Sequence, residues 1–229
     1  MSSSTAAPTA APVATLHYIY DPLCGWCYAA APLVQAARSV PGLAIAFHGG
    51  GMLAGASRRT ITADWREHVL PHDRRIAQLT NQTFGAAYLD GLLRDVGAPM
   101  DSEPPIAAAL AAQALAGRGL DMIDRLQRAH YVEGRRIAEP EVLVEMAATL
   151  GLDADAFGAS FAGLVGEPTR AHIAASRQLM ARVGGQGFPT FALEQSEGRF
   201  TAIDTSAWLG RADAWRSHLA DALGATAAA

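Results

Sequence analysis

The stretch Asp21-Pro22-Leu23-Cys24-Gly25-Trp26-Cys27-Tyr28 holds the only two cysteines of a 229-residue chain and separates them by two residues. The segment before it, Leu16-His17-Tyr18-Ile19-Tyr20, has the composition of a short strand, and residues 28–40 have that of a helix. This order predicts that Cys24 lies at a strand-to-helix turn.

The position of the pair suggests redox chemistry. The first N–H groups of a helix are unpaired and its dipole is positive there, so a thiolate at the turn is stabilised. Cys-x-x-Cys pairs at helix starts include reactive, acidic thiols. We therefore predict that Cys24 is the nucleophile and that Cys27 resolves the mixed disulfide formed on Cys24. Trp26, between them, is expected to tune exposure and potential.

The sequence also allows two other uses of the cysteines. A structural zinc ion needs four ligands, and the chain has no second cysteine pair. His68 and His72 are four residues apart, a spacing that suits a solvated helix face as well as a metal site. Redox chemistry is favoured over a metal site and over inert cysteines, and no metal is predicted.

Composition limits the partners and the compartment. Half of the residues are hydrophobic and 17% are charged, which is typical of a compact globular protein. The net charge of −4 provides no basic surface for nucleic acid. No segment reaches the ~18 apolar residues of a membrane span. Residues 1–14 lack the basic and apolar parts of a secretory signal, so we expect a disordered leader and a cytoplasmic protein whose dithiol rests reduced.

The two ends of the chain have β-strand patterns. Residues 16–20, 28–40 and 43–48 predict a βαβ unit, followed by Gly49-Gly50-Gly51 as a flexible loop. Near the other end, the segments 188–193 and 199–203 predict a β-hairpin, and 206–223 an amphipathic helix. Between them, residues 62–183 are rich in Ala, Leu, Arg and Gln and are broken by Gly and Pro, which predicts an all-helical block of about six helices.

These features together resemble the thioredoxin fold, and the helical block resembles that of the DsbA-like branch. Residues 21–28 and the segment Val183-Gly184-Gly185-Gln186-Gly187-Phe188-Pro189-Thr190-Phe191 look like two signatures of its FrnE-like, cytoplasmic protein-disulfide-isomerase members. The resemblance implies an α/β protein: a thioredoxin-like domain of residues 15–61 and 184–224, with a large all-helical insertion domain of residues 62–183.

The resemblance also implies roles for particular residues. Cys24 would be the attacking thiol, Cys27 the resolving thiol and Pro189 the cis-proline that faces them, so that the backbone of Phe188 pairs with an extended substrate. A trans proline that begins an edge strand is the alternative. Trp26, Tyr28 and Phe188 are the predicted substrate-binding residues. Trp26 and Tyr28 are expected to form, with Met52, an apolar cleft that the helical block caps.

One position departs from the family pattern. Many relatives carry a buried carboxylate six residues before the first cysteine, where it moves the proton of the resolving cysteine, whereas this chain has Tyr18. A phenol titrates near ~10 and is a poor base at neutral pH. Water, Asp21 or His48 are the candidates to replace that group.

The function predicted from these residues is that of a thiol-disulfide oxidoreductase or disulfide isomerase. Its partners would be a disulfide-containing protein, a peptide or a small thiol. It would need no cofactor beyond its own dithiol, with glutathione as a possible co-substrate. One alternative is a glutathione-dependent transferase or isomerase, because kappa-class glutathione transferases and hydroxychromene-carboxylate isomerases resemble the same architecture; these usually carry Ser at the first cysteine position. A non-enzymatic partner or metal binder is the third possibility.

Overall fold

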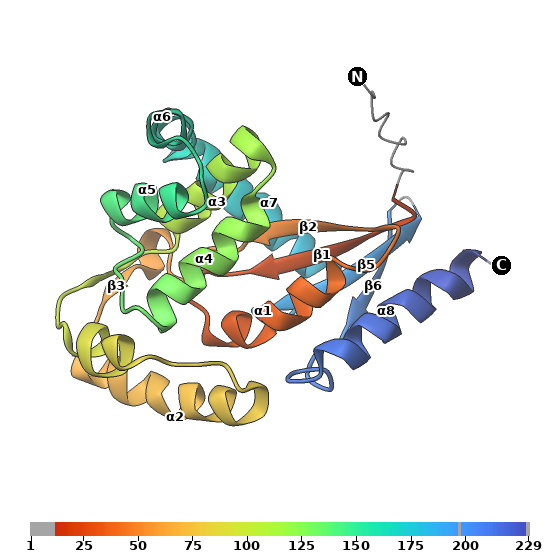
Figure 1. The fold of residues 1–229 in the computed structure, drawn as a ribbon, viewed down its shortest axis with the longest axis horizontal. Helices are drawn as coiled ribbons and strands as arrows, with labels where there is room; N and C mark the ends of the chain where they lie inside the picture. Colours follow the sequence, from red (N-terminus) through yellow and green to blue (C-terminus); the bar gives the residue numbers. More distant parts are fainter. Residues whose placement is uncertain (1–11, 197, 228–229) are drawn as a thin grey trace, which may run out of the picture.

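The computed structural model describes residues 12–196 and 198–227. A four-stranded sheet forms its centre, in the order β2-β1-β5-β6 (Figure 1). β1 pairs parallel with β2 and antiparallel with β5, and β5 pairs antiparallel with β6. The strands are β1 (Ala14–Tyr20), β2 (Leu43–Gly49), β5 (Thr190–Ser196) and β6 (Arg199–Ile203). The predicted βαβ unit and hairpin are thus confirmed, and they share one sheet.

The central strand β1 is covered on both faces. Its Leu16, Tyr18 and Tyr20 pack with α1 (Gly25–Ala37) and α8 (Ala212–Ala227), where the indole of Trp215 donates a hydrogen bond to the carbonyl of Leu33 at 3.0 Å. On the other face, Ile19 packs with the end of α7 (Glu167–Arg182). Because β1 is buried on both sides, its end holds the cysteine turn in a fixed place.

The block between the β-rich ends contains six α-helices, all within the described residues. Besides α7 these are α2 (Ala63–Thr80), α3 (Glu103–Ala116), α4 (Gly119–Tyr131), α5 (Pro140–Thr149) and α6 (Ala154–Leu164), with a π-helical turn η2 (Ala87–Gly91) and a 3-10 turn η3 (Leu92–Arg94). Local signals start several of them: the side chains of Thr62 and Asp153 cap α2 and α6. None of the helices in the described ranges is long and apolar enough to cross a membrane.

The structure corrects several sequence expectations. The block is not all-helical, because β4 (Pro99–Met100) pairs with β3 (Arg59–Thr60) after a short 3-10 turn, η1 (Gly55–Ser57). Proline at the start of β4 disfavours helix there. The last helix begins at Ala212 rather than at 206. Residues 1–11 of the expected disordered leader lie outside the described residues. Ala14, at the end of that expected leader, belongs to β1. The division into two domains remains a prediction.

The triple-glycine segment is packed and not a flexible loop. A Cβ on Gly50 would lie 2.0 Å from the ring of Phe188, and one on Gly49 would lie 2.6 Å from Ile106. Arg177 donates hydrogen bonds to the carbonyls of Gly50 and Gly51. The missing side chains therefore allow close packing here rather than mobility.

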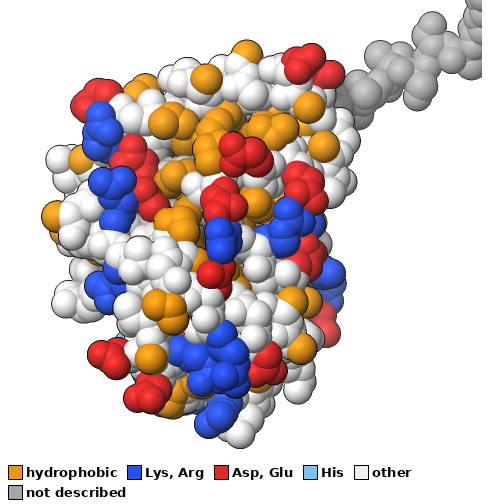
Figure 2. Space-filling view, turned by 90° about the vertical axis from the view of Figure 1, so that its left-hand side faces the viewer, with side chains coloured by type: hydrophobic (Ala, Val, Ile, Leu, Met, Phe, Trp, Pro, Cys, Tyr) orange, Lys and Arg blue, Asp and Glu red, His pale blue; other side chains and the backbone are white. Residues whose placement is uncertain are grey.

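The outer surface of the helical block carries many charges. Acidic and basic side chains are interspersed over this side of the molecule (Figure 2). Arg125 forms an ion pair with Glu133 at 2.8 Å, and Arg135 pairs with Glu145 beside it. These pairs tie α4, the turn after it and α5 together at the surface.

Candidate active site

Cys24 is the N-cap residue of α1. Its backbone is extended, with φ −93° and ψ 114°, and its carbonyl accepts hydrogen bonds from the N–H groups of Cys27 and Tyr28 at 3.0 and 3.1 Å. The helix thus starts at the cysteine turn, three residues before the predicted position. Both cysteines are free thiols in this structure.

The two thiols have different surroundings. Cys24 is 6% exposed and lines a cavity, whereas Cys27 is fully buried. Burial raises the pKa of the Cys27 thiol well above its usual range, and a hydrogen bond with Cys24 adds to this shift. The backbone N–H of Asp21 lies 3.4 Å from the Cys27 sulfur, in position to donate to it. Cys27 is therefore a neutral thiol at rest that must lose a proton before it can react.

The Phe188–Pro189 segment faces the dithiol. Its peptide bond is cis, as predicted, and the trans alternative is wrong. The thiol of Cys24 lies 3.5 Å from the carbonyl oxygen of Phe188 and can donate to it. The ring of Phe188 packs directly against Gly50, where there is no room for a Cβ. The segment before β5 thus contacts the cysteine turn at the sulfur of Cys24.

Asp21 joins three segments under the turn. Its buried carboxylate accepts hydrogen bonds from the N–H of Leu23 at 2.9 Å, the N–H of Met52, and the hydroxyl of Ser102 at 2.9 Å. Burial raises its pKa from 3.8 to about 6, although these hydrogen bonds oppose that shift. The carboxylate therefore holds the cysteine turn against the loop after β2 and the start of α3.

The other groups considered for proton transfer differ in position. The hydroxyl of Tyr18 donates to the carbonyl of Cys27 at 3.4 Å, and burial raises its pKa well above 10, so it is no base. His48 is hydrogen-bonded to His17 at 3.0 Å, and burial lowers its pKa to about 4. Of the candidates Asp21 and His48, Asp21 contacts Cys27. It does so through its backbone N–H and not through its carboxylate.

A cavity of about 230 Å³ opens beside Cys24, between the start of α1, α2 and the end of α4. We call it the dithiol cleft. Its walls are mainly apolar, and its polar members come from α2, η2 and α4. The lining residues that matter here are Trp26, Met52, Trp65, His68, His72, Asp73, Tyr88, His130 and Tyr131. The predicted cleft is thus present, with Trp26 and Met52 in its wall.

The structure places Tyr28 behind this cleft rather than in its wall. Its ring stacks on Tyr131 with centroids 4.8 Å apart, and its hydroxyl donates to the carbonyl of Thr83 at 2.8 Å. Only 4% of the residue is exposed. The predicted substrate contact of Tyr28 is therefore not supported by its position.

Several lining residues carry no local sequence signal. Asp73 lies in a charged segment of α2 that is typical of a solvated helix face, yet it is buried. The sequence around Trp65, Tyr88 and His130 fits an ordinary buried helix face as well as it fits a cleft wall. In the described parts of the chain, no group of three or more His, Cys, Asp or Glu side chains is placed to hold a metal ion.

A dithiol at the start of a helix, facing a cis-proline directly before the neighbouring strand β5, defines the class of thioredoxin-fold thiol-disulfide oxidoreductases. The description of the family model that matches residues 15–214 is "DSBA-like thioredoxin domain". The chain belongs to this DsbA-like family. It is a protein-disulfide oxidoreductase, and the fold and family expected from the two motifs are confirmed.

Solved structures agree with this assignment. The cytosolic disulfide reductase DsbM from Pseudomonas aeruginosa is 56% identical, with a TM-score of 0.86 over 91% of this chain and 98% of that one. The same protein with GSH gives 55% identity and a TM-score of 0.85 over 91% and 98%. A candidate protein disulfide isomerase from Nitrosomonas europaea shares the fold at 24% identity and a TM-score of 0.74, over 92% and 98%. No curated protein matched the sequence.

Proposed function

We propose that this oxidoreductase works as a cytoplasmic disulfide reductase, with Cys24 as the nucleophile and Cys27 as the resolving thiol. The observation that carries the proposal is the difference in exposure between the two cysteines: Cys24 lines the dithiol cleft, whereas Cys27 is fully buried. The likeness to a cytosolic disulfide reductase supports both the direction and the compartment.

The reaction proceeds by two exchanges. The thiolate of Cys24 attacks one sulfur of the substrate disulfide, the S–S bond breaks, and the first substrate thiolate leaves and takes a proton from water. Cys27 then loses its proton and attacks the sulfur of Cys24, which releases the second substrate thiol. Two electrons pass from the dithiol to the substrate, and a Cys24–Cys27 disulfide remains.

Phe188, Pro189 and Trp26 have positioning roles in this proposal. The carbonyl of Phe188 lies within hydrogen-bond distance of the Cys24 thiol, where an extended substrate would pair with the backbone. Trp26 supplies an apolar wall beside the attacked sulfur. The backbone N–H of Asp21 favours the thiolate of Cys27 as it forms.

A small thiol is the reductant that would return the enzyme to its dithiol form. Two thiol molecules reduce the Cys24–Cys27 disulfide and leave as one disulfide. The cleft volume of about 230 Å³ admits a molecule of that size. A structure of DsbM with GSH supports glutathione as the first thiol to test.

The test is turnover of 2-hydroxyethyl disulfide with glutathione, followed through recycling of oxidised glutathione. The unaltered chain should turn over. Cys24→Ser should lose more than ~1000-fold in kcat/KM because it has no nucleophile. Cys27→Ser should accumulate a mixed disulfide on Cys24, visible as an added mass. A Cys24→Ser variant that keeps its activity, or conjugates glutathione to an electrophile, would point instead to the transferase class.

A further inference from the structure

Asp73 places a buried carboxyl group in the dithiol cleft. The residue is 4% exposed, and one oxygen, Oδ2, accepts a hydrogen bond from the hydroxyl of Tyr88 at 3.0 Å. Burial raises the pKa of this carboxyl from 3.8 to about 6. At neutral pH it is therefore ionised in a mainly apolar site.

The second oxygen, Oδ1, borders the cysteine turn. A Cβ built on Gly25 would lie 3.3 Å from this oxygen, and Gly25 directly follows Cys24. Asp73 and Cys24 also line the same cavity. A substrate whose sulfur meets Cys24 therefore brings its neighbouring atoms close to this carboxylate.

Asp73 forms no ion pair within the described residues, and the nearby guanidinium of Arg75 lies over the ring of Trp26 in the cleft wall, 5.7 Å from the ring centroid. The pKa of Asp73 is affected by burial and by Tyr88, and no arginine lies within ion-pair distance of it in the described part of the chain. A buried charge normally has a partner, because its desolvation is otherwise uncompensated. The floor of the cleft thus has a place for one positive group.

The other titratable groups around the cleft do not fill that place. Tyr131 is uncharged, since burial raises its pKa well above 10. Burial lowers the pKa of His130 to about 4, so its ring is neutral, and its Nδ1 has no hydrogen-bond partner within the described residues. His68 and His72 are exposed residues of α2 at the rim. An unsatisfied ring nitrogen and an unpaired carboxylate thus line one cavity.

We propose that Asp73 determines substrate specificity by binding a positively charged group next to the sulfur that Cys24 attacks. The ligand class is that of small disulfides carrying a primary ammonium group, because an ammonium group supplies the positive charge and the hydrogen-bond donors that Oδ1 can accept, and a cavity of about 230 Å³ admits a small molecule. Asp73 binds this group through Oδ1, while Tyr88 holds Oδ2. The inference rests on the proposed disulfide reduction and assigns the substrate class of that site.

The test compares three disulfides with the same two-carbon spacing and different ends. Cystamine is cationic, 2-hydroxyethyl disulfide is neutral and 3,3′-dithiodipropionate is anionic. Asp73→Asn keeps the shape and an acceptor for Tyr88 but removes the charge. It should lower kcat/KM for cystamine about tenfold, as expected for a charge-assisted hydrogen bond, leave the neutral disulfide within about twofold and raise the anionic one.

Asp155→Asn is the matched control. Asp155 is an exposed residue in the first turn of α6 and is not part of the cleft lining, so it makes the same change in net charge elsewhere. All three disulfides should react with this variant as they do with the unaltered chain. A loss of cystamine turnover in Asp155→Asn would assign the preference to overall charge and overturn the proposal.

The pH dependence gives a second measurement that needs no variant. The ratio of kcat/KM for cystamine to that for the neutral disulfide cancels every pH effect that is common to the two reactions. This ratio should fall as the pH drops through about 6, because Asp73 becomes protonated. The part of the slope that Asp73→Asn removes is the part due to Asp73.

Two results would overturn the proposal. An equal loss for all three disulfides in Asp73→Asn would mean that Asp73 acts on the dithiol, and no change for any of them would mean that it binds no substrate charge. Should the variant not fold, a pH-independent ratio in the unaltered chain overturns the proposal by itself. If the unaltered chain reduces none of the three disulfides, the proposed function fails instead.

Discussion

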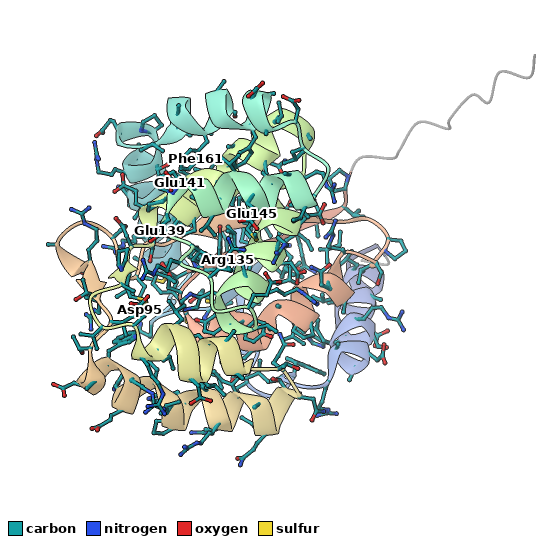
Figure 3. The ribbon with its side chains drawn as sticks, turned by 60° about the vertical axis from the view of Figure 1, so that its left-hand side comes forward. Asp95, Arg135, Glu139, Glu141, Glu145 and Phe161 are labelled. Carbon is teal, nitrogen blue, oxygen red and sulfur yellow. The ribbon has the colours of Figure 1, made fainter. Side chains whose placement is uncertain are left out.

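The pKa values of carboxylates shift in opposite directions in the dithiol cleft and on the outer face of the helical block. On the outer face, Glu145 pairs with Arg135 (Figure 3), and this arginine lowers the pKa of Glu145. In the cleft, Asp73 has no such partner and burial raises its pKa. An exposed ion pair contributes little to stability, whereas a buried unpaired charge lowers it. The buried carboxylate whose pKa is raised is therefore the candidate functional group, and the ion-paired carboxylates belong to a solvated surface.

The largest effect that tests this difference concerns the two thiols. Iodoacetamide at pH 7 should alkylate Cys24 more than ~100-fold faster than Cys27, because Cys27 is fully buried and its raised pKa leaves little thiolate. Peptide mass spectrometry after partial alkylation measures both rates. Faster labelling of Cys27 would reverse the roles assigned to the pair.

A smaller effect is expected on stability. The pKa of Asp73 is higher in the folded protein than its ordinary value of 3.8, so the folded state binds more protons and the contribution of Asp73 to stability falls as the pH rises from about 4 to about 6. Asp73→Asn removes this loss. At pH 7.5 it should raise the free energy of unfolding by about 1–3 kcal/mol relative to the unaltered chain.

Urea unfolding at pH 7.5 and pH 4 measures this change. The gain should shrink or disappear at pH 4, where the carboxyl of the unaltered protein is protonated when folded. Asp155→Asn serves again as the control and should show no such pH dependence. A destabilised Asp73→Asn at pH 7.5 would show that the carboxylate supports the fold, which removes the contrast with the outer face.

The smallest effect is expected on the outer face itself. Glu145→Gln breaks the ion pair with Arg135 at an exposed position. Solvent and salt screen such pairs, so neither the thermal midpoint nor the turnover of any disulfide should change measurably. Differential scanning calorimetry and the disulfide assays provide the two readouts. Loss of turnover in this variant would extend the functional region beyond the cleft.

Local sequence patterns were sufficient for the part of the site that is formed by short segments. The strand, the turn with Cys24 and the start of α1 follow one another along the chain, so their geometry depends on neighbouring residues. Pro189 in a glycine-rich segment before a hairpin was equally recognisable. These two motifs predicted the class of fold and the redox-active dithiol, and the family resemblance that they carry implied the cis bond beside it.

Only the tertiary structure decided which other groups share the cleft. Asp73 and His130 come from α2 and α4. Their burial depends on packing against segments that are distant from them in the sequence. For the same reason Tyr28 stacks on Tyr131 behind the cleft, and Gly50 accommodates the ring of Phe188. Helical periodicity shows which face of a helix can be buried, but it does not contain the partner against which that face packs. The sequence by itself therefore determined the reactive dithiol, and the packing of the helices determined what surrounds it.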